Sequence, residues 1–270
     1  MMLAAFEGWT DAGAAASAAG SYLADRWGAR RFADIDAEEF YDFTALRPQV
    51  SLRDDRNREI VWPQNQFLAA RAGDRDIVLM IGVEPHLRWR AFSRCVTTVA
   101  ADLGVRGVFT LGAMLADVAH TRAVPVGSST ADPAMARDYG LSRPQYEGPT
   151  GIAGVLQDAF TKVDIPAASL MAQVPHDVAG TPSPKATLAI VERVARLLSI
   201  PLTTSELQRA AVEYEQQVSE VVAADEDMVR YVRELEHRAD EAEREDQLPE
   251  IPSGEALAAE LERFLREQDG

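Results

Sequence analysis

Cysteine and long apolar runs are both scarce in this chain of 270 residues. A single cysteine, Cys95, excludes an internal disulfide framework and fits the reducing environment of the cytosol. Cys95 falls on the apolar stripe of a predicted helix, so we expect it to be buried. The longest near-continuous apolar run, Ile77–Val83, is strand-sized and far shorter than the ~20 residues of a membrane helix. No basic segment precedes the first apolar residues, so we expect a cytoplasmic protein without a secretory signal.

The sequence also lacks the short motifs that mark phosphate, metal and nucleophile sites. No GxGxxG follows a predicted strand. Gly8 and Gly13 have the spacing of a P-loop, but Ala14 and Ala15 stand where Lys and Ser/Thr would bind phosphate and magnesium. The GxSxG of hydrolases, HExxH and paired CxxC are all missing. We therefore expect no metal site and no cofactor, and we assign no catalytic residue.

Basic residues are fewer than acidic residues, 27 against 43, which gives a net charge of −16. Residues 201–270 hold 20 acidic residues and 7 arginines, a net charge of −13, whereas residues 1–200 hold 23 acidic and 20 basic residues, a net charge of −3. The acidity is thus concentrated in the last quarter of the chain. Nucleic-acid phosphates and anionic lipids would be repelled by such a segment, so we expect neither nucleic acid nor a membrane as a partner.

Short apolar runs alternate with helical patterns over residues 1–200, which is typical of an α/β protein. We expect strands at Leu3–Phe6, Arg31–Ile35, Glu59–Trp62, Ile77–Val83, Val105–Leu111, Arg122–Gly127 and Ala168–Val174. We expect helices at Ala12–Trp27, Phe92–Leu103, Ile152–Val163 and Lys185–Leu198. The apolar character of Ile77–Val83 indicates a strand that is buried on both faces.

Beyond Pro201 the pattern predicts helices only, over Thr204–Ala224 and Asp225–Asp246. Their apolar stripes should pack on the α/β core or on a neighbouring subunit, because amphipathic helices are stabilised by burial. The stripes consist of Leu207, Ala210, Ala211, Tyr214, Val218 and Val221, and of Met228, Tyr231, Val232, Leu235 and Ala239. We predict an α/β domain at residues 1–200, an acidic helical hairpin or extension at 201–246, and a linker with a short helix at 247–270.

Polar side chains follow several predicted strands, where ligands bind in open α/β sheets. The pocket candidates are Asp11, Glu84, His86, Arg90, Asp117, His120, Glu147 and His176. Carboxylates and imidazoles can transfer protons, and an arginine can bind an anion. The alternative is that these residues cap helices, as Asp11 would before its alanine-rich helix. The segment Glu147–Gly151 opens a helix, and either it binds an anion or it is a plain turn.

Several distinctive segments follow one another along the chain, and in order they read AFEGWTDAG, EEFYDF, RPQV, IVWP, GVEPHLRWRAF, LGAMLADVAHTRAVPV, YEGPTGIAGVL, VPH and SPKATLAIV. Together they resemble the proteasome assembly chaperone family, in its bacterial branch related to the second eukaryotic chaperone. The resemblance covers roughly residues 3–240. Two positions depart from it, Thr10 where the family often has Asn and Ala123 where Pro is common. The first strand begins early for this family, which suggests a truncated N-terminus or a misassigned start codon.

The resemblance implies a three-layer α/β/α fold of the phosphorylase/hydrolase-like class with a mixed, mostly parallel sheet. It implies a homo-oligomer, for which a trimer is one form, and protein clients rather than a chemical reaction. The leading hypothesis is a non-enzymatic assembly chaperone or scaffold with an unknown client. The alternative is a small-molecule binder or enzyme with its pocket at the carboxyl ends of the strands. Fold analogy alone does not decide between them.

Overall fold

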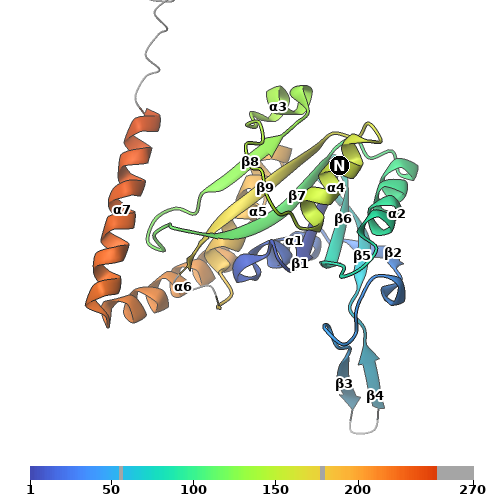
Figure 1. The fold of residues 1–270 in the computed structure, drawn as a ribbon, viewed down its shortest axis with the longest axis horizontal. Coiled ribbons are helices and arrows are strands. Elements are labelled where there is room, and N and C mark those ends of the chain that lie inside the picture. Colours follow the sequence, from blue (N-terminus) through green and yellow to red (C-terminus); the bar gives the residue numbers. More distant parts are fainter. Residues whose placement is uncertain (55–56, 177–179, 248–270) are drawn as a thin grey trace, which may run out of the picture.

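The computed structural model describes residues 1–54, 57–176 and 180–247 of the chain. Its main sheet contains seven strands, β1 (Met2–Glu7), β2 (Arg30–Ile35), β5 (Asn65–Ala72), β6 (Arg75–Val83), β7 (Val108–Ala116), β8 (Val126–Thr130) and β9 (Ala167–Pro175). The strand order is β2-β5-β6-β1-β7-β9-β8 (Figure 1). The four central strands are parallel, and β2, β5 and β8 are antiparallel to their neighbours. The sheet is therefore mixed and mostly parallel, as predicted.

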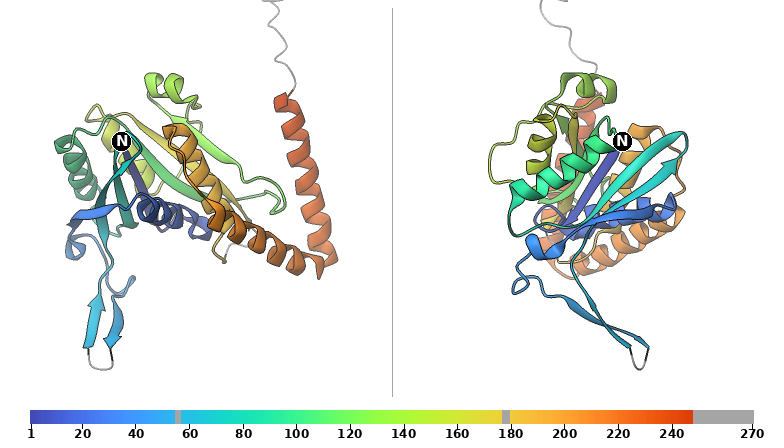
Figure 2. Two further views of the ribbon diagram at one scale, coloured as in Figure 1. Left: turned by 180° about the vertical axis from the view of Figure 1, so that it is seen from behind. Right: turned by 90° about the vertical axis from the view of Figure 1, so that its right-hand side faces the viewer.

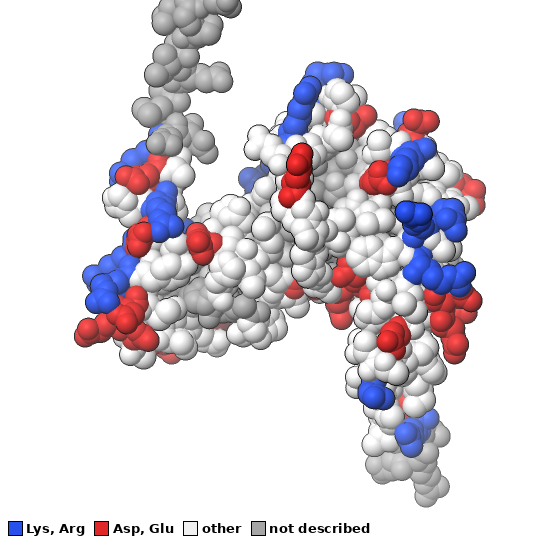
Figure 3. Space-filling model, in the orientation of Figure 1, with Lys and Arg blue, Asp and Glu red and all other residues white. Residues whose placement is uncertain are grey.

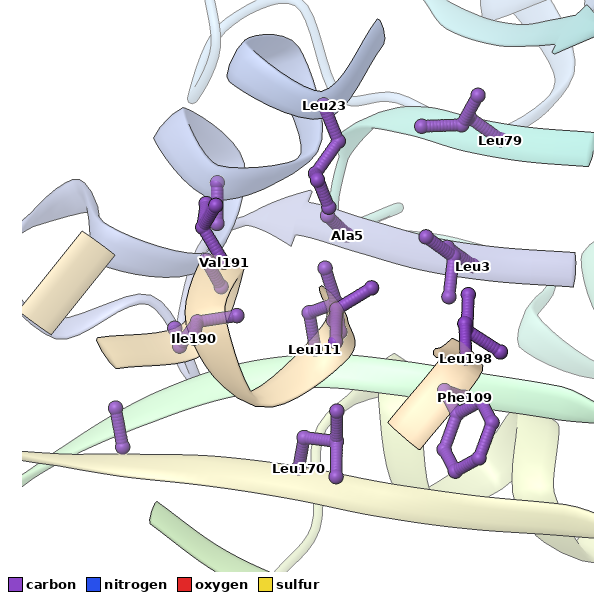
Figure 4. Close-up of a cluster of buried hydrophobic side chains, with 14 of the residues drawn as sticks. Leu3, Ala5, Leu23, Leu79, Phe109, Leu111, Leu170, Ile190, Val191 and Leu198 are labelled. Carbon is purple, nitrogen blue, oxygen red and sulfur yellow. The ribbon is translucent and has the colours of Figure 1, made fainter. Parts of the chain in front are cut away.

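Helices cover both faces of this sheet, which confirms the three-layer α/β/α arrangement (Figure 2). Helices α1 (Ala15–Arg26) and α5 (Pro184–Leu198) lie on one face, and α2 (Trp89–Asp102) and α4 (Ile152–Thr161) lie on the other. Side chains alternate along β1, so that Leu3 packs in the first core and Phe6 in the second. Figure 4 shows the first core, where Leu3, Leu111 and Ile190 meet between β1, β7 and α5.

Small residues bring α1 close to the sheet. A Cβ added at Gly20 would lie 2.9 Å from the Cβ of Ala5 on β1, which is closer than real Cβ atoms approach. Ala15, Ala16 and Ala19 are fully buried on the same helix. The alanine-rich sequence after the first strand therefore allows a close helix–sheet contact, which a larger side chain at position 20 would prevent.

Two elements extend from this three-layer body (Figure 1). The first is a hairpin of β3 (Gln49–Asp54) and β4 (Asn57–Val61), which form a separate two-stranded sheet. The second, which we name the arm, consists of α6 (Ser205–Ala223) and α7 (Glu226–Gln247). A short helix, α3 (Pro133–Tyr139), follows β8. The two predicted tail helices are confirmed as α6 and α7, and the division of the chain into three domains stays a prediction.

The sequence pattern misses or misplaces several elements. It does not predict β3, β5 or α3, and it places the seventh and eighth strands at Val105–Leu111 and Arg122–Gly127 instead of Val108–Ala116 and Val126–Thr130. β5 reads Asn-Gln-Phe-Leu-Ala-Ala-Arg-Ala, which is too poor in β-branched residues to signal a strand. Its position between β2 and β6 comes from long-range pairing, which a local pattern does not contain.

Two side-chain predictions are wrong. Cys95 is exposed, because the buried face of α2 runs through Phe92, Val96 and Ala100 instead. Val221 is 74% exposed, and its neighbour Val222 is buried in its place. In both cases the residue one position further along the helix is buried instead. Successive residues of a helix are rotated by about 100°, so an error of one position exchanges a buried side chain for an exposed one.

The predicted break at Asp246–Ser253 falls mostly outside the described residues, and so does the short amphipathic stretch after it. Within the described part of the chain, no helix combines the length and apolar character that crossing a bilayer requires.

Candidate functional site

A cleft of about 910 Å³ opens at the carboxyl ends of the parallel strands. Its walls come from the loop Gly8–Ala14 after β1, the end of β7, the middle of β9, the start of α4 and the segments before α4 and α5. The chain leaves β1 towards β2 on one side of the sheet, and after β6 it crosses to β7 on the other side of β1. Such a reversal is where open α/β sheets bind their ligands. The cleft is therefore the first candidate for a small-molecule site.

Asp11 lies on this cleft, but its carboxylate is used by the chain itself. Oδ1 accepts hydrogen bonds from the backbone N–H groups of Ala16 (2.8 Å) and Ser17 (3.1 Å), and Oδ2 accepts one from Ser17 Oγ (2.6 Å). Three donors at the start of α1 are thus satisfied by one side chain. The capping role that the sequence suggests for Asp11 is confirmed.

Glu84 follows β6 and joins two walls of the cleft. Its Oε2 accepts a hydrogen bond from Trp9 N (3.0 Å), and its Oε1 accepts one from Ile152 N at the start of α4 (2.6 Å). Gly8 makes room for this carboxylate, since its φ is +142° and an added Cβ would lie 2.7 Å from the Cβ of Glu84. Glu84 therefore caps α4 from 68 residues away in the sequence.

His86 and Arg90 lie outside the cleft. His86 Nδ1 accepts a hydrogen bond from Asp42 N (3.2 Å), and its ring packs edge-on against Tyr41 at 5.8 Å. Burial raises the pKa of the Tyr41 hydroxyl above its ordinary range. Arg90 is exposed in the first turn of α2. Neither residue lines the cleft.

Three further candidates lie where the β7–β8 loop meets the arm. Asp117 Oδ1 accepts a hydrogen bond from Tyr231 OH (3.0 Å) and is 3.9 Å from Nε2 of His176, which is half-exposed. His120 is 3% exposed, and its Nε2 is 3.0 Å from Ser219 Oγ on α6. The hollow beside His120 measures about 10 Å³, which is at most the room of one water molecule. These contacts hold the arm to the body.

Glu147 is exposed in the segment before α4 and does not line the cleft. The start of α4, which we considered as an anion site, already has an anion, because the Glu84 carboxylate accepts from Ile152 N. Of the two interpretations of Glu147–Gly151, the structure supports the turn.

The eight candidates therefore do not converge on one pocket, and only Asp11 is part of the cleft wall. Whether any of them binds a ligand stays a prediction. Sequence reasoning missed most of the cleft wall, whose side chains include Trp9, Met114, Tyr146, Gln157, Ser169 and Met171. Neutral residues of this kind carry no motif, and their proximity depends on the pairing of β7 with β9 and on the packing of α4. Among the described residues, no three His, Cys, Asp or Glu side chains are arranged to hold a metal ion.

Comparison with known proteins gives the relatives of this chain. A PAC2 family protein from Streptomyces avermitilis is 45% identical, with a TM-score of 0.81, over 86% of this chain and 98% of that one. A proteasome-assembly chaperone homologue from Mycobacterium tuberculosis is 43% identical, with a TM-score of 0.78, over 86% and 99% of the two chains.

An archaeal proteasome activator from Pyrococcus furiosus shares the fold, with a TM-score of 0.63 at 18% identity over 82% of this chain and 92% of that one. No curated protein gives a match. The model of the PAC2 family matches residues 5–222, which span the three-layer body from the middle of β1 onwards and nearly all of α6. The chain therefore belongs to the PAC2 family, as the order of its sequence segments suggested.

Proposed function

We propose that this chain is a non-enzymatic assembly chaperone or scaffold that holds a client protein through the β3–β4 hairpin. The observation that carries the proposal is an uncovered apolar face on that hairpin. Val50, Leu52 and Ile60 are 50%, 74% and 42% exposed. The relative from Mycobacterium tuberculosis is described as a proteasome-assembly chaperone homologue, which makes proteasome subunits the first clients to test.

The register of the hairpin separates its two faces. Val50 pairs with Ile60 and Leu52 pairs with Arg58, so these side chains share one face. Gln49 pairs with Val61, and Ser51 pairs with Glu59, on the other face. Apolar residues therefore gather on one side of a ribbon that has only two strands. In Figure 3 much of the hairpin surface is uncharged.

The base of the hairpin is well anchored, so its position on the body is defined. Phe43 precedes β3 in the sequence and Trp62 follows β4, and their rings pack edge to face with their centroids 4.9 Å apart. Just before this segment, Tyr41 OH donates to the carbonyl of Val83 (2.6 Å) on β6. Beyond these anchors the two strands pair only with each other, and an isolated two-stranded hairpin has marginal stability in water. Covering its apolar face with another surface would stabilise it. A protein partner that packs on Leu52 and Ile60 would supply that surface.

The test compares two variants that add the same charge to opposite faces of the hairpin. Purified full-length protein carrying Leu52→Asp or Gln49→Asp is mixed with proteasome α-subunits, and complexes are measured by native mass spectrometry. We expect Leu52→Asp to abolish the complex and Gln49→Asp to retain it. Retention by both variants, or absence of a complex with the unmodified chain, contradicts the proposal.

Self-association is read from the same spectra. The resemblance to the family implies a homo-oligomer, and the hairpin could serve that contact instead of a client contact. If Leu52→Asp lowers the oligomeric mass while client binding by the remaining protomers persists, the hairpin joins copies of this chain and the client proposal fails. A cytoplasmic location stays a prediction.

A further inference from the structure

The cleft at the carboxyl ends differs from the anion sites that α/β folds usually build there. Two helix starts form part of its wall, those of α1 and α4. In such folds, free backbone N–H groups at helix starts bind phosphates or carboxylates of the ligand. Here Asp11 accepts from the N–H groups of Ala16 and Ser17, and Glu84 accepts from that of Ile152. The chain thus supplies its own anion at both helix starts.

The charge of the wall follows from this arrangement. Asp11 is the only charged side chain among the described residues that line the cleft, and none of them is basic. Glu84 lies directly behind Trp9, to which it is hydrogen bonded. A ligand anion would meet the Asp11 carboxylate, with the Glu84 carboxylate nearby and no cation among the lining residues, so it would lose its hydration without compensation. The lining therefore disfavours nucleotides, sugar phosphates and carboxylic acids.

The remaining lining suits an uncharged molecule with a flat apolar body. Trp9, Tyr146 and Met114 are 61%, 70% and 50% exposed at the cleft. Met171 lies against the backbone of Gly112, where an added Cβ would lie 2.7 Å from its methyl carbon. Rings and thioethers of this kind pack well on aromatic ligands. The volume, about 910 Å³, falls within the range of small-molecule sites.

The polar groups of the wall both donate and accept hydrogen bonds. They are the side chains of Thr10, Ser129, Thr150, Gln157, Ser169 and Thr181. Gln157 is held in place because its Nε2 donates to Thr110 Oγ1 (2.8 Å). Hydroxyls and a carboxamide match a ligand edge that has both a donor and an acceptor, such as an amide.

An extended peptide fits the cleft less well than a small molecule. Strand β7 is paired with β9 along its whole length, and on its other side with β1 over Val108–Leu111 and with Asp11 at Ala113, while β9 is paired with β7 and β8. The outer edge of β8 is covered, since Thr130 N donates to Ser142 O and Ser142 N donates to Ser128 O. Among the described residues of these strands, β7 lacks a partner on its β1 side only over Met114–Ala116, a stretch shorter than the usual strand of about 5–6 residues, so a peptide would gain little by adding a strand there.

From these observations we propose that the cleft binds an uncharged aromatic molecule with an amide-like edge. The site is separate from the hairpin, so the proposal does not depend on the client-binding function. The wall contains no nucleophile–base pair among its described residues, and the inference is one of binding alone.

The experiment uses two pairs of probes, indole-3-acetamide with indole-3-acetate and nicotinamide with nicotinate. The members of each pair share a ring system and differ only in having a neutral amide or a carboxylate. Binding to the full-length protein is measured by ligand-observed NMR and isothermal titration at neutral pH. We expect each amide to bind at least tenfold more tightly than its acid. Equal or tighter binding of the acids overturns the proposal, and so does the absence of binding by both amides at millimolar concentration.

Three variants locate the binding. Trp9→Ala should weaken the amides about tenfold, whereas Phe32→Ala, which truncates an exposed ring on β2 away from the cleft, should leave binding unchanged. Met114→Arg adds the missing cation at the rim and should improve binding of indole-3-acetate at least tenfold. Circular dichroism verifies that each variant is folded. If Trp9→Ala and Phe32→Ala behave alike, or if Met114→Arg leaves the acid unbound, the cleft is not the site.

Discussion

The hairpin and the arm both extend from the three-layer body, and each has an apolar face. The apolar face of the arm is buried within the chain, whereas that of the hairpin is exposed. In Figure 1 the hairpin points away at the lower right, and α7 stands at the left. On the arm, Tyr214, Val218 and Leu235 are 6%, 7% and 3% exposed. On the hairpin, Leu52 is 74% exposed. The two extensions therefore differ in what their apolar residues are available to do.

The arm is covered because the β7–β8 loop reaches it. Ala119 of that loop packs in one cluster with side chains of α6 and α7. Polar contacts surround the cluster: Arg122 pairs with Asp240 (2.6 Å) and Glu236 (3.1 Å), and Lys185 pairs with Glu215 and donates to the carbonyl of His120. The stripes therefore pack mostly on each other and on Ala119, and Leu207 of α6 packs against the first core. The packing on a neighbouring subunit, which we gave as the alternative, stays a prediction.

This difference separates a folding role from a binding role. The arm buries its stripe within one chain, so its apolar residues contribute to the stability of the fold. The hairpin makes no such contact in the described structure, so its apolar residues are free to contribute to association. An aspartate in place of an aliphatic side chain should therefore lower the stability of the fold in the arm, whereas in the hairpin it should lower association and leave the stability nearly unchanged.

The largest effect is expected for Val218→Asp. The carboxylate would enter an apolar cluster with Tyr214 and Val222 on α6 and Leu235 on α7. We expect a loss of about 3 kcal/mol in the free energy of unfolding, because a charge is buried among apolar side chains. Urea denaturation followed by circular dichroism measures it. Val221→Asp, on the exposed side of the same helix, is the control and should change stability by less than about 0.5 kcal/mol.

A smaller effect is expected for Lys185→Met. The side chain of Lys185 is 16% exposed, and its ammonium group holds α5 to both α6 and the β7–β8 loop. Its removal leaves the Glu215 carboxylate and a backbone carbonyl without their donor. We expect a loss of about 1–2 kcal/mol in the free energy of unfolding, since hydrogen bonds to charged groups are worth about that much. An unchanged urea midpoint would show that solvent replaces this contact.

A pH effect is expected at the outer end of the arm, and it should be smaller still because the pair is exposed. The hydrogen bond from Arg122 lowers the pKa of Asp240 below its ordinary value. A carboxyl whose pKa is lowered by folding stabilises the folded form above its unfolded pKa of about 3.9, and the stabilisation is lost as the pH falls through the folded pKa. Between pH 7 and 5 the contact should therefore not change.

Hydrogen exchange of α7 measured at neutral and acidic pH tests this expectation. The protection of α7 amides relative to their intrinsic exchange should fall only below about pH 4, and Arg122→Gln should remove that acid step by returning the pKa of Asp240 to its ordinary range. A step near pH 6 would point to a histidine instead and would contradict the role of this pair.

Helical periodicity predicted the arm well and the hairpin poorly. The stripe through Tyr214 and Val218 repeats over many turns, so an error of one residue at Val221 does not hide the helix. β3 and β4 are short, rich in charged residues, and paired only with each other. The sequence also does not show that the face of Leu52 stays open, because exposure depends on what the rest of the chain fails to cover.

In the candidate site, too, the sequence predicts local contacts and misses those that depend on the tertiary fold. Asp11 could be predicted as a cap, because it lies a few residues before the helix that it caps. Glu84 could not, because its partner Ile152 lies 68 residues away and becomes a neighbour through the parallel sheet. Choosing charged residues at strand ends therefore selected side chains that the fold uses for itself. The neutral wall of the cleft, with Trp9 and Gln157, lacked a signal.

The smallest effect on stability is expected for Leu52→Asp, the hairpin counterpart of Val218→Asp. Both variants replace an aliphatic side chain with a carboxylate, but Leu52 is 74% exposed and lies opposite Arg58, which can pair with the new charge. The free energy of unfolding should change by less than about 0.5 kcal/mol. Urea denaturation at two protein concentrations measures it, because a hairpin covered by a second copy would make the effect depend on concentration. A loss of 2 kcal/mol or so at high concentration that disappears on dilution would place the apolar face in a homo-oligomer contact, and the contrast with the arm would then hold only for the single chain.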